Sequence, residues 1–115
     1  MSNKTIKVST EKDITIIRVM QKRIFLEISD QFRDEVVSVI EDGGTKLIFD
    51  LSQVHVMNSS GLGVLMLARD KIEKRDGKIV ICCLMPLMDE IFTRMRFTHF
   101  FDVTRDLKSA IEKME

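Results

Sequence analysis

Residues 46–69 read KLIFDLSQVHVMNSSGLGVLMLAR, and this stretch decides the fold. Its apolar run at 47–49 ends at Asp50, which is typical of a buried strand. The apolar residues of 62–72 recur at helical spacing, which predicts an α-helix. A serine pair at 59–60 lies between the two patterns. The stretch therefore predicts a strand, a loop and a helix, with two hydroxyl groups at the helix start.

The start of a helix is a favourable place for an anion. Its first backbone N–H groups lack partners and carry partial positive charge, so a negative group placed there is stabilised. A phosphate carried by one of the serines would turn the loop into a switch. Serine, asparagine and glycine are also common helix caps for structural reasons alone. Composition by itself favours this capping interpretation.

Residues 50–65, DLSQVHVMNSSGLGVL, resemble the signature of the STAS domain, the module of bacterial anti-sigma factor antagonists. The usual form of that signature is D-L-S-x-V-x-x-M/I-D-S-S/T-G-L-G. The resemblance extends over essentially the whole chain in length and element order. It implies an α/β fold with a small mixed β-sheet and helices packed mainly on one side. We expect residues 1–115 to form a single STAS domain.

The resemblance also implies a partner-switching function. The unmodified protein would bind an anti-sigma factor that is also a serine kinase, and so release a sigma factor. Phosphorylation of Ser59 would end the binding, and a phosphatase would restore it. The ATP would belong to the partner, so we expect no cofactor and no metal. The residues expected to bind the partner are Asn58, Ser60, Gly61, Leu62 and Gly63, with the two glycines allowing close approach.

Two departures from the family pattern leave a second binding function open. Asn58 stands where the antagonists usually have Asp, so the capping shape is kept and the charge is lost. Residues 21–24, QKRI, are basic where the antagonists commonly show G-x-L-D. The alternative is a STAS subunit of a lipid-transport ABC complex or of a stress-sensing assembly, which is not phosphorylated.

An enzymatic function is a third hypothesis, and the motifs argue against it. Ser59 does not lie in the G-x-S-x-G pattern of a nucleophile elbow. His55 is the histidine near it, and a single loop histidine is usually a surface or packing residue. The glycines at 61 and 63 lack the third glycine of a dinucleotide loop, and no P-loop lysine follows them. We therefore expect a binding module rather than a serine hydrolase.

The overall composition is that of one globular domain. The chain has 115 residues, of which 44% are hydrophobic and 31% charged. Its 18 basic residues are balanced by 18 acidic ones, so no positive excess is available for a nucleic-acid backbone. No apolar run is long enough to span a bilayer, and the first ten residues resemble no signal segment. We expect a cytoplasmic protein, and a monomer because no apolar stripe is left over.

Periodicity predicts the remaining elements around this centre. Residues 21–27 are expected to be irregular, and residues 97–101 are expected to form a short apolar strand with its flanks. Cys82 and Cys83 are adjacent on a predicted strand, so we expect them on opposite faces as reduced core residues. The expected strands are 6–8, 14–20 and 78–84. The expected helices begin at Ser29 or Asp30, at Pro86, and at Thr104 or Asp106. In the helix from Pro86 we expect an apolar stripe of Leu87, Ile91 and Met95, with Met88 and Phe92 beside it.

Overall fold

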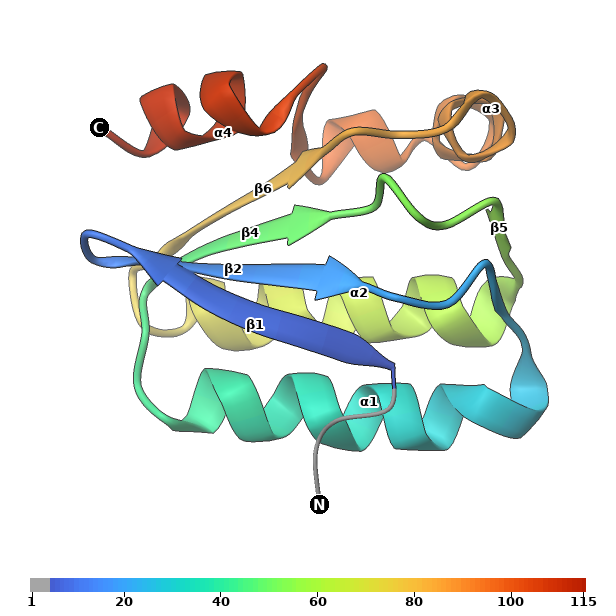
Figure 1. Cartoon of the computed structure of the whole chain (residues 1–115), viewed down its shortest axis with the longest axis horizontal. Coiled ribbons are helices and arrows are strands. Elements are labelled where there is room, and N and C mark those ends of the chain that lie inside the picture. The colour runs from blue at the N-terminus through green and yellow to red at the C-terminus, as the bar shows by residue number, and fades with distance from the viewer. Residues whose placement is uncertain (1–4) are drawn as a thin grey trace.

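Strand β4 (Lys46–Asp50) is the central strand of a five-stranded sheet in the computed structural model, which describes residues 5–115. The strand order is β1-β2-β4-β6-β7 (Figure 1). β1 and β2 form an antiparallel hairpin, and the other three pairs are parallel. Residues 47–50 are all buried, as expected for a strand covered on both faces. The other strands of the sheet are β1 (Ile6–Glu11), β2 (Ile14–Val19), β6 (Lys78–Cys82) and β7 (Asp102–Thr104).

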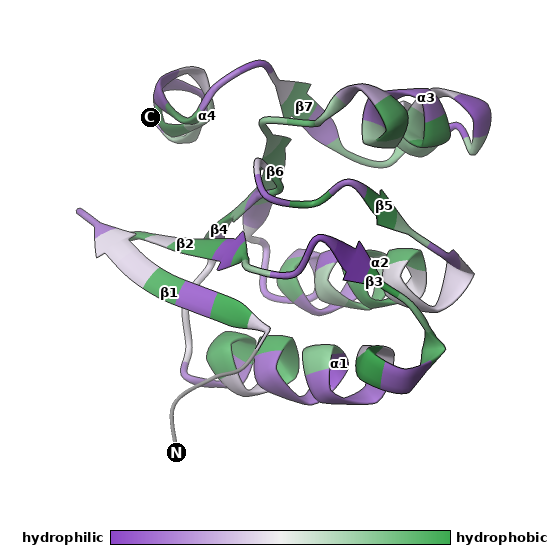
Figure 2. Cartoon of the chain, turned by 45° about the vertical axis from the view of Figure 1, so that its right-hand side comes forward, coloured by the Kyte–Doolittle hydropathy of each residue, from purple (hydrophilic) through white to green (hydrophobic). Residues whose placement is uncertain are grey.

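Helices cover the two faces of the sheet unequally. α1 (Leu26–Glu41) and α2 (Ser59–Glu73) lie together on one face, and α4 (Leu107–Met114) lies on the other (Figure 1). The larger core belongs to the first face, and the smaller core lies under α4. Figure 2 shows that α1 turns its apolar side toward the sheet. The predicted mixed sheet with helices mainly on one side is confirmed.

Two very short strands tie together the segments that precede α1 and α2. β3 (Arg23–Ile24) pairs in parallel with β5 (Val56–Met57), apart from the main sheet. The amide of Asn58 continues the pairing by donating to the carbonyl of Ile24 at 3.1 Å. The prediction that residues 21–27 are irregular is therefore wrong at β3. The consequence is that the start of α2 is fixed against the strand that leads into α1.

Helix α1 begins earlier than predicted. Its N-cap is Phe25, which offers no capping side chain, and the helix starts at Leu26 instead of after Ser29 or Asp30. Ser29 is buried inside the first turn, and its hydroxyl donates to the Leu26 carbonyl at 3.0 Å. The helix ends at Glu41, and Gly43 lies just beyond it with a φ of 111°.

Helix α3 (Pro86–Arg94) begins with the predicted proline but buries a different stripe. Met88 and Phe92 are completely buried, whereas Leu87 is 48% and Met95 50% exposed. α3 packs against β5, and this contact determines which residues of α3 are buried. The sequence pattern did not reveal β5. The predicted stripe is wrong for Leu87 and Met95, whereas Ile91 does pack against the main core.

The segment after α3 is a short 3₁₀ helix, η1 (Phe97–His99), and not a strand. Phe97 and Phe101 pack with Phe92 at ring-centroid distances of 5.2–6.3 Å, which buries two of the three clustered phenylalanines that follow α3. Asp106 then caps α4, as predicted, by accepting from the Ser109 amide at 2.8 Å.

The carboxyl-terminal end of the chain lies against the β1–β2 turn. The last residue, Glu115, forms an ion pair of 2.7 Å with Lys12 in the β1–β2 turn. The prediction that the first ten residues form no signal segment falls partly on residues 1–4, which lie outside the described residues. Among residues 5–115 no helix combines the length and the apolar character that crossing a membrane requires.

Candidate functional site

Residues 58–63, called the serine loop below, follow β5 directly and form the N-cap and first turn of α2. Asn58 is the N-cap, with an extended backbone at φ −87° and ψ −174°. Its side-chain oxygen accepts from the Ser60 amide at 3.1 Å, the Gly61 amide at 3.4 Å and the Ser60 hydroxyl at 2.6 Å. The capping interpretation is therefore confirmed for Asn58, which satisfies two of the free N–H groups at the helix start.

The two serines have different surroundings. Ser59 is exposed at the first position of α2, and its hydroxyl has no hydrogen-bond partner among residues 5–115. Ser60 is partly buried, and its hydroxyl is committed to the Asn58 side chain. A reagent or enzyme can reach the Ser59 hydroxyl without breaking a contact. Modification of Ser60 would break a hydrogen bond of the cap.

The structure places the predicted partner-binding residues at different depths. Gly61 is buried, and a β-carbon there would lie 2.8 Å from Cγ2 of Ile24 and 3.2 Å from Cβ of Met57. Leu62 is 4% exposed and belongs to the main core. Gly63 is exposed, with open space around its Cα. Gly61 and Leu62 therefore hold the loop from inside, and in this conformation they offer a partner little or no surface.

A groove beside the serine loop runs between the first turns of α1 and α2. Its most exposed apolar residue is Leu26, at 73% exposure. Leu26 was not among the predicted site residues, because it lies in a segment that was expected to be irregular. A single apolar residue at the first position of a helix does not by itself produce the helical periodicity of apolar residues that would have revealed it. The groove is lined by Leu26, Ser29, Asp30, Arg33, Ser60, Gly63, Val64 and Leu67.

Asp50 anchors the chain where β4 passes into the segment before the serine loop. The side chain is 2% exposed; one oxygen accepts from the Ser52 amide at 2.9 Å and the other from Nε of Arg18 at 3.1 Å. Burial alone would raise the pKa of Asp50, but the hydrogen bonds from Ser52 and Arg18 together outweigh it and hold the pKa below its usual value. Asp50 is thus an ionised turn cap at the end of β4.

Basic side chains lie next to the serine loop. Lys22 and Arg23 are exposed, and β3–β5 pairing places them beside the residues that lead to Ser59. The Lys22 carbonyl accepts from the amides of His55 at 2.8 Å and Val56 at 3.2 Å. The His55 side chain is exposed and forms no hydrogen bond with Ser59. Exposed basic residues therefore lie beside β5, the strand that leads to Ser59, and His55 supplies no base to the Ser59 hydroxyl.

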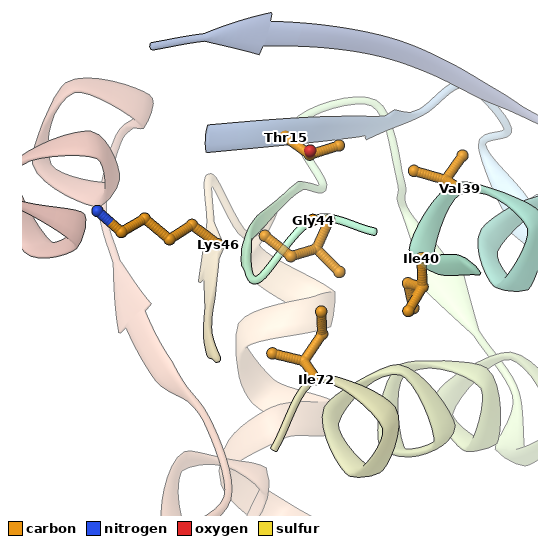
Figure 3. Close-up of a pocket in the computed structure, with 7 residues that line it drawn as sticks. Thr15, Val39, Ile40, Gly44, Lys46 and Ile72 are labelled. Atoms are coloured by element: carbon orange, nitrogen blue, oxygen red, sulfur yellow. The ribbon is translucent and has the colours of Figure 1, made fainter. Parts of the chain in front are cut away.

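A small cavity at the other end of β4 does not belong to this site. Figure 3 shows Thr15, Ile40 and Ile72 around Gly44, with the Lys46 side chain directed away. Lys46 is the first residue of β4, whereas the serine loop lies beyond the last one. The cavity is lined mainly by apolar side chains and is a packing gap in the core.

Known proteins share the sequence pattern and the fold of this chain. The family model of the STAS domain matches residues 5–110. BtrV of Bordetella bronchiseptica, described as a candidate anti-sigma factor antagonist, is 24% identical over 98 residues, which cover 85% of this chain and 84% of BtrV. The chain belongs to the STAS domain family.

Solved structures show the same fold. An anti-sigma factor antagonist from Mycobacterium paratuberculosis superposes with a TM-score of 0.86 at 20% identity, covering 96% of this chain and 92% of that one. The phosphorylated form of the Bacillus cell fate determinant SpoIIAA superposes with a TM-score of 0.71 at 18% identity, covering 96% and 99%. Relatives and structural neighbours of this chain therefore include anti-sigma factor antagonists.

Proposed function

We propose that this protein is an anti-sigma factor antagonist-like binding module that is switched off by phosphorylation of Ser59. In its unmodified state it binds an anti-sigma factor that is also a serine kinase. Phosphorylation releases the partner, and a phosphatase resets the cycle. The observation that carries the proposal is the contrast between the exposed, unpartnered Ser59 hydroxyl and the Ser60 hydroxyl held in the helix cap.

A phosphate on Ser59 is compatible with the fold. The Ser60 and Gly61 amides are already taken by Asn58, so the phosphate gains mainly from the positive end of the α2 dipole and from nearby basic side chains. The dipole contributes about 0.3–1 kcal/mol at an exposed site. Asn58 adds no negative charge, whereas an Asp at this position would repel the phosphate. We therefore expect the phosphorylated protein to keep its stability.

The same phosphate opposes binding of a partner that packs on the serine loop. A phosphate adds nearly two negative charges near neutral pH, and burying them without a paired cation costs several kcal/mol. A loss of about 3 kcal/mol weakens binding more than a hundredfold. The groove with exposed Leu26 supplies an apolar contact beside the loop, and Lys22 and Arg23 favour an acidic rim on the partner.

The site supports binding better than catalysis. A serine nucleophile needs a base within hydrogen-bond reach, and within residues 5–115 no side chain hydrogen-bonds to Ser59. The serine-hydrolase hypothesis would also require an oxyanion site, but Asn58 occupies the two nearest helix amides. A non-enzymatic module is therefore the function we propose.

The test uses three variants with the anti-sigma factor kinase from the same organism. Ser59→Ala is expected to keep binding in titration calorimetry, and Ser59→Asp is expected to weaken it at least a hundredfold (about 3 kcal/mol). Incubation of the wild type with the kinase and ATP is expected to label Ser59, read by mass spectrometry of peptides. Ser60→Ala is the matched control, since it removes the neighbouring hydroxyl and is expected to leave labelling of Ser59 intact.

Two outcomes would contradict the proposal. Tight binding by Ser59→Asp would show that a negative charge at this position does not block the partner. Labelling confined to Ser60 would show that the exposed hydroxyl is not the modified one. Either result would favour the alternative of a subunit in a lipid-transport or stress-sensing assembly that is not phosphorylated.

A further inference from the structure

The sequence predicted that Cys82 and Cys83 point to opposite faces of the sheet, and this prediction is wrong. β6 ends at Cys82, and Cys83 adopts a left-handed backbone conformation with φ of 71°. This conformation is uncommon for a residue with a side chain and is often found at functional positions. It turns the second side chain back, so that the two sulfur atoms lie 3.0 Å apart.

The dithiol lies between the carboxyl end of β6 and helix α4. Cys82 is completely buried in the smaller core, and Cys83 is only partly buried. A carboxylate oxygen of Asp50 lies within 4.8 Å of both sulfur atoms. Backbone hydrogen bonds hold the pair in place, since the Cys82 carbonyl accepts from Leu51 at 3.1 Å and the Cys83 amide donates to Thr104 at 3.3 Å. The two thiols are therefore adjacent, fixed and reachable from one side.

We propose that Cys82 and Cys83 form a reversible dithiol–disulfide pair, a redox modification site at the carboxyl end of β6. The oxidant is a small-molecule disulfide of the glutathione class. This site is separate from the serine loop, and the inference does not depend on the function proposed for Ser59.

The reaction proceeds in two exchange steps. The thiolate of Cys83, the more accessible sulfur, attacks one sulfur of the small-molecule disulfide, forms a mixed disulfide and releases one small thiolate. The Cys82 thiolate then attacks the Cys83 sulfur, forms the protein disulfide and releases the second small thiolate. Two protein thiols lose two electrons and two protons, and the small-molecule disulfide gains both as two thiols.

Geometry makes the product easy to reduce. Consecutive Cα atoms are about 3.8 Å apart across a trans peptide, and ordinary disulfides join Cα atoms about 4.4–6.8 Å apart. A bond between neighbours is therefore strained, and strained disulfides have more oxidising potentials. The pair is suited to a labile bond and not to a permanent structural crosslink.

The charges around the pair predict how its oxidation depends on pH. Burial raises the pKa of the Cys83 thiol; the contact with Cys82 lowers it, and the carboxylates of Asp50 and Asp106 raise it again. Burial likewise raises the pKa of Cys82 well above its usual range. Among the basic groups around the pair, Arg18 is paired with Asp50, and Arg105 and Lys108 act on Asp106. Because the thiolate is the attacking form, oxidation is expected to accelerate as pH rises from 7 toward 9.

The test follows the thiols of the intact protein by mass spectrometry. The folded chain is incubated with oxidised glutathione, unfolded and treated with N-ethylmaleimide. The expected product has lost two hydrogen atoms, takes up no maleimide and remains monomeric on a non-reducing gel. Brief treatment with dithiothreitol under native conditions is expected to restore both alkylation sites. Since the sequence has two cysteines, no other thiol can contribute.

Single variants separate the two steps. In Cys82→Ser a glutathione adduct on Cys83 is expected to persist, because the attacking second thiol is missing. In Cys83→Ser the buried Cys82 is expected to remain unmodified in the folded protein. Circular dichroism checks that both variants are folded. Full alkylation of the oxidised wild type, a lasting adduct on it, or a disulfide-linked dimer would each overturn the proposal.

Discussion

Replacing Gly61 with alanine tests whether the serine loop is held from inside by close packing. The new methyl group would lie 2.8 Å from Cγ2 and 3.2 Å from Cβ of Ile24. Ile24 is completely buried and β-branched, so its methyl group cannot swing into solvent. Overpacking of this kind costs about 1–3 kcal/mol. Alanine recovers about 0.5–1 kcal/mol in a helix, which leaves a net destabilisation of roughly 0–2.5 kcal/mol.

Gly63→Ala is the matched control, because it lies in the same first turn and its β-carbon would meet nothing within 4 Å. It gains the helix preference without the clash, so we expect it to stabilise the protein by about 0.5–1 kcal/mol. The difference between the two variants then equals the clash alone, about 1–3 kcal/mol. In thermal unfolding this corresponds to roughly 4–12 °C between their Tm values.

The assay is urea and thermal unfolding followed by far-ultraviolet circular dichroism, since the chain contains no tryptophan or tyrosine to report by fluorescence. Wild type and the two variants are compared at the same pH and protein concentration. Equal stability of Gly61→Ala and Gly63→Ala would refute the reasoning. That result would mean that β3 does not press on the start of α2 in solution.

Four further predictions concern the cap, the buried carboxylate, the groove and the assembly state. Asn58→Ala removes the three hydrogen bonds of the cap, and we expect unfolding measurements to show a loss of about 0.5–2 kcal/mol, whereas Asn58→Asp keeps most of the stability. The lowered pKa of Asp50 stabilises the fold above its unfolded pKa, about 3.9, and this contribution disappears as pH falls through the folded value. Acid unfolding of Asp50→Asn should therefore show a flatter pH dependence below pH 4 than the wild type, together with lower stability at pH 7. Leu26→Ser should weaken binding of the kinase about tenfold or more without changing Tm, and Leu87→Ser on α3 should bind like wild type in the same calorimetric titration. Sedimentation velocity at micromolar concentration should show a monomer, and a stable dimer would point to the exposed side chains of Leu87, Met95 and Phe100.

The long elements of the fold could be predicted because their patterns are local. β2 and β4 show strand patterns within their own residues, and Asp106 is an ordinary helix cap. β3 and β5 have two residues each, which is too short for any period to appear. Their pairing joins segments more than thirty positions apart, so it depends on the tertiary structure. The same holds for the start of α1, where Phe25 gives no capping signal.

In the candidate site, too, the local features could be predicted from the sequence and the tertiary contacts could not. Asn58 and the serine pair stand out from the sequence because capping chemistry is local. The burial of Gly61 follows from Ile24 on β3, and no local pattern contains that contact. The approach of Cys82 and Cys83 depends on one left-handed residue after a strand. Alternation along a strand predicts the opposite arrangement, and it stops being valid where the strand ends.

The ion pair between Lys12 and Glu115 indicates where the protein can be attached for binding measurements. It places the last residue beside the β1–β2 turn, at the end of the sheet where the parallel strands begin (Figure 1). The serine loop follows the opposite ends of those strands. A dye, an affinity handle or a sensor-chip linker attached after Glu115 therefore leaves the serine loop facing the solution. Immobilisation by this end should preserve the on-rate of a partner that docks on Ser59.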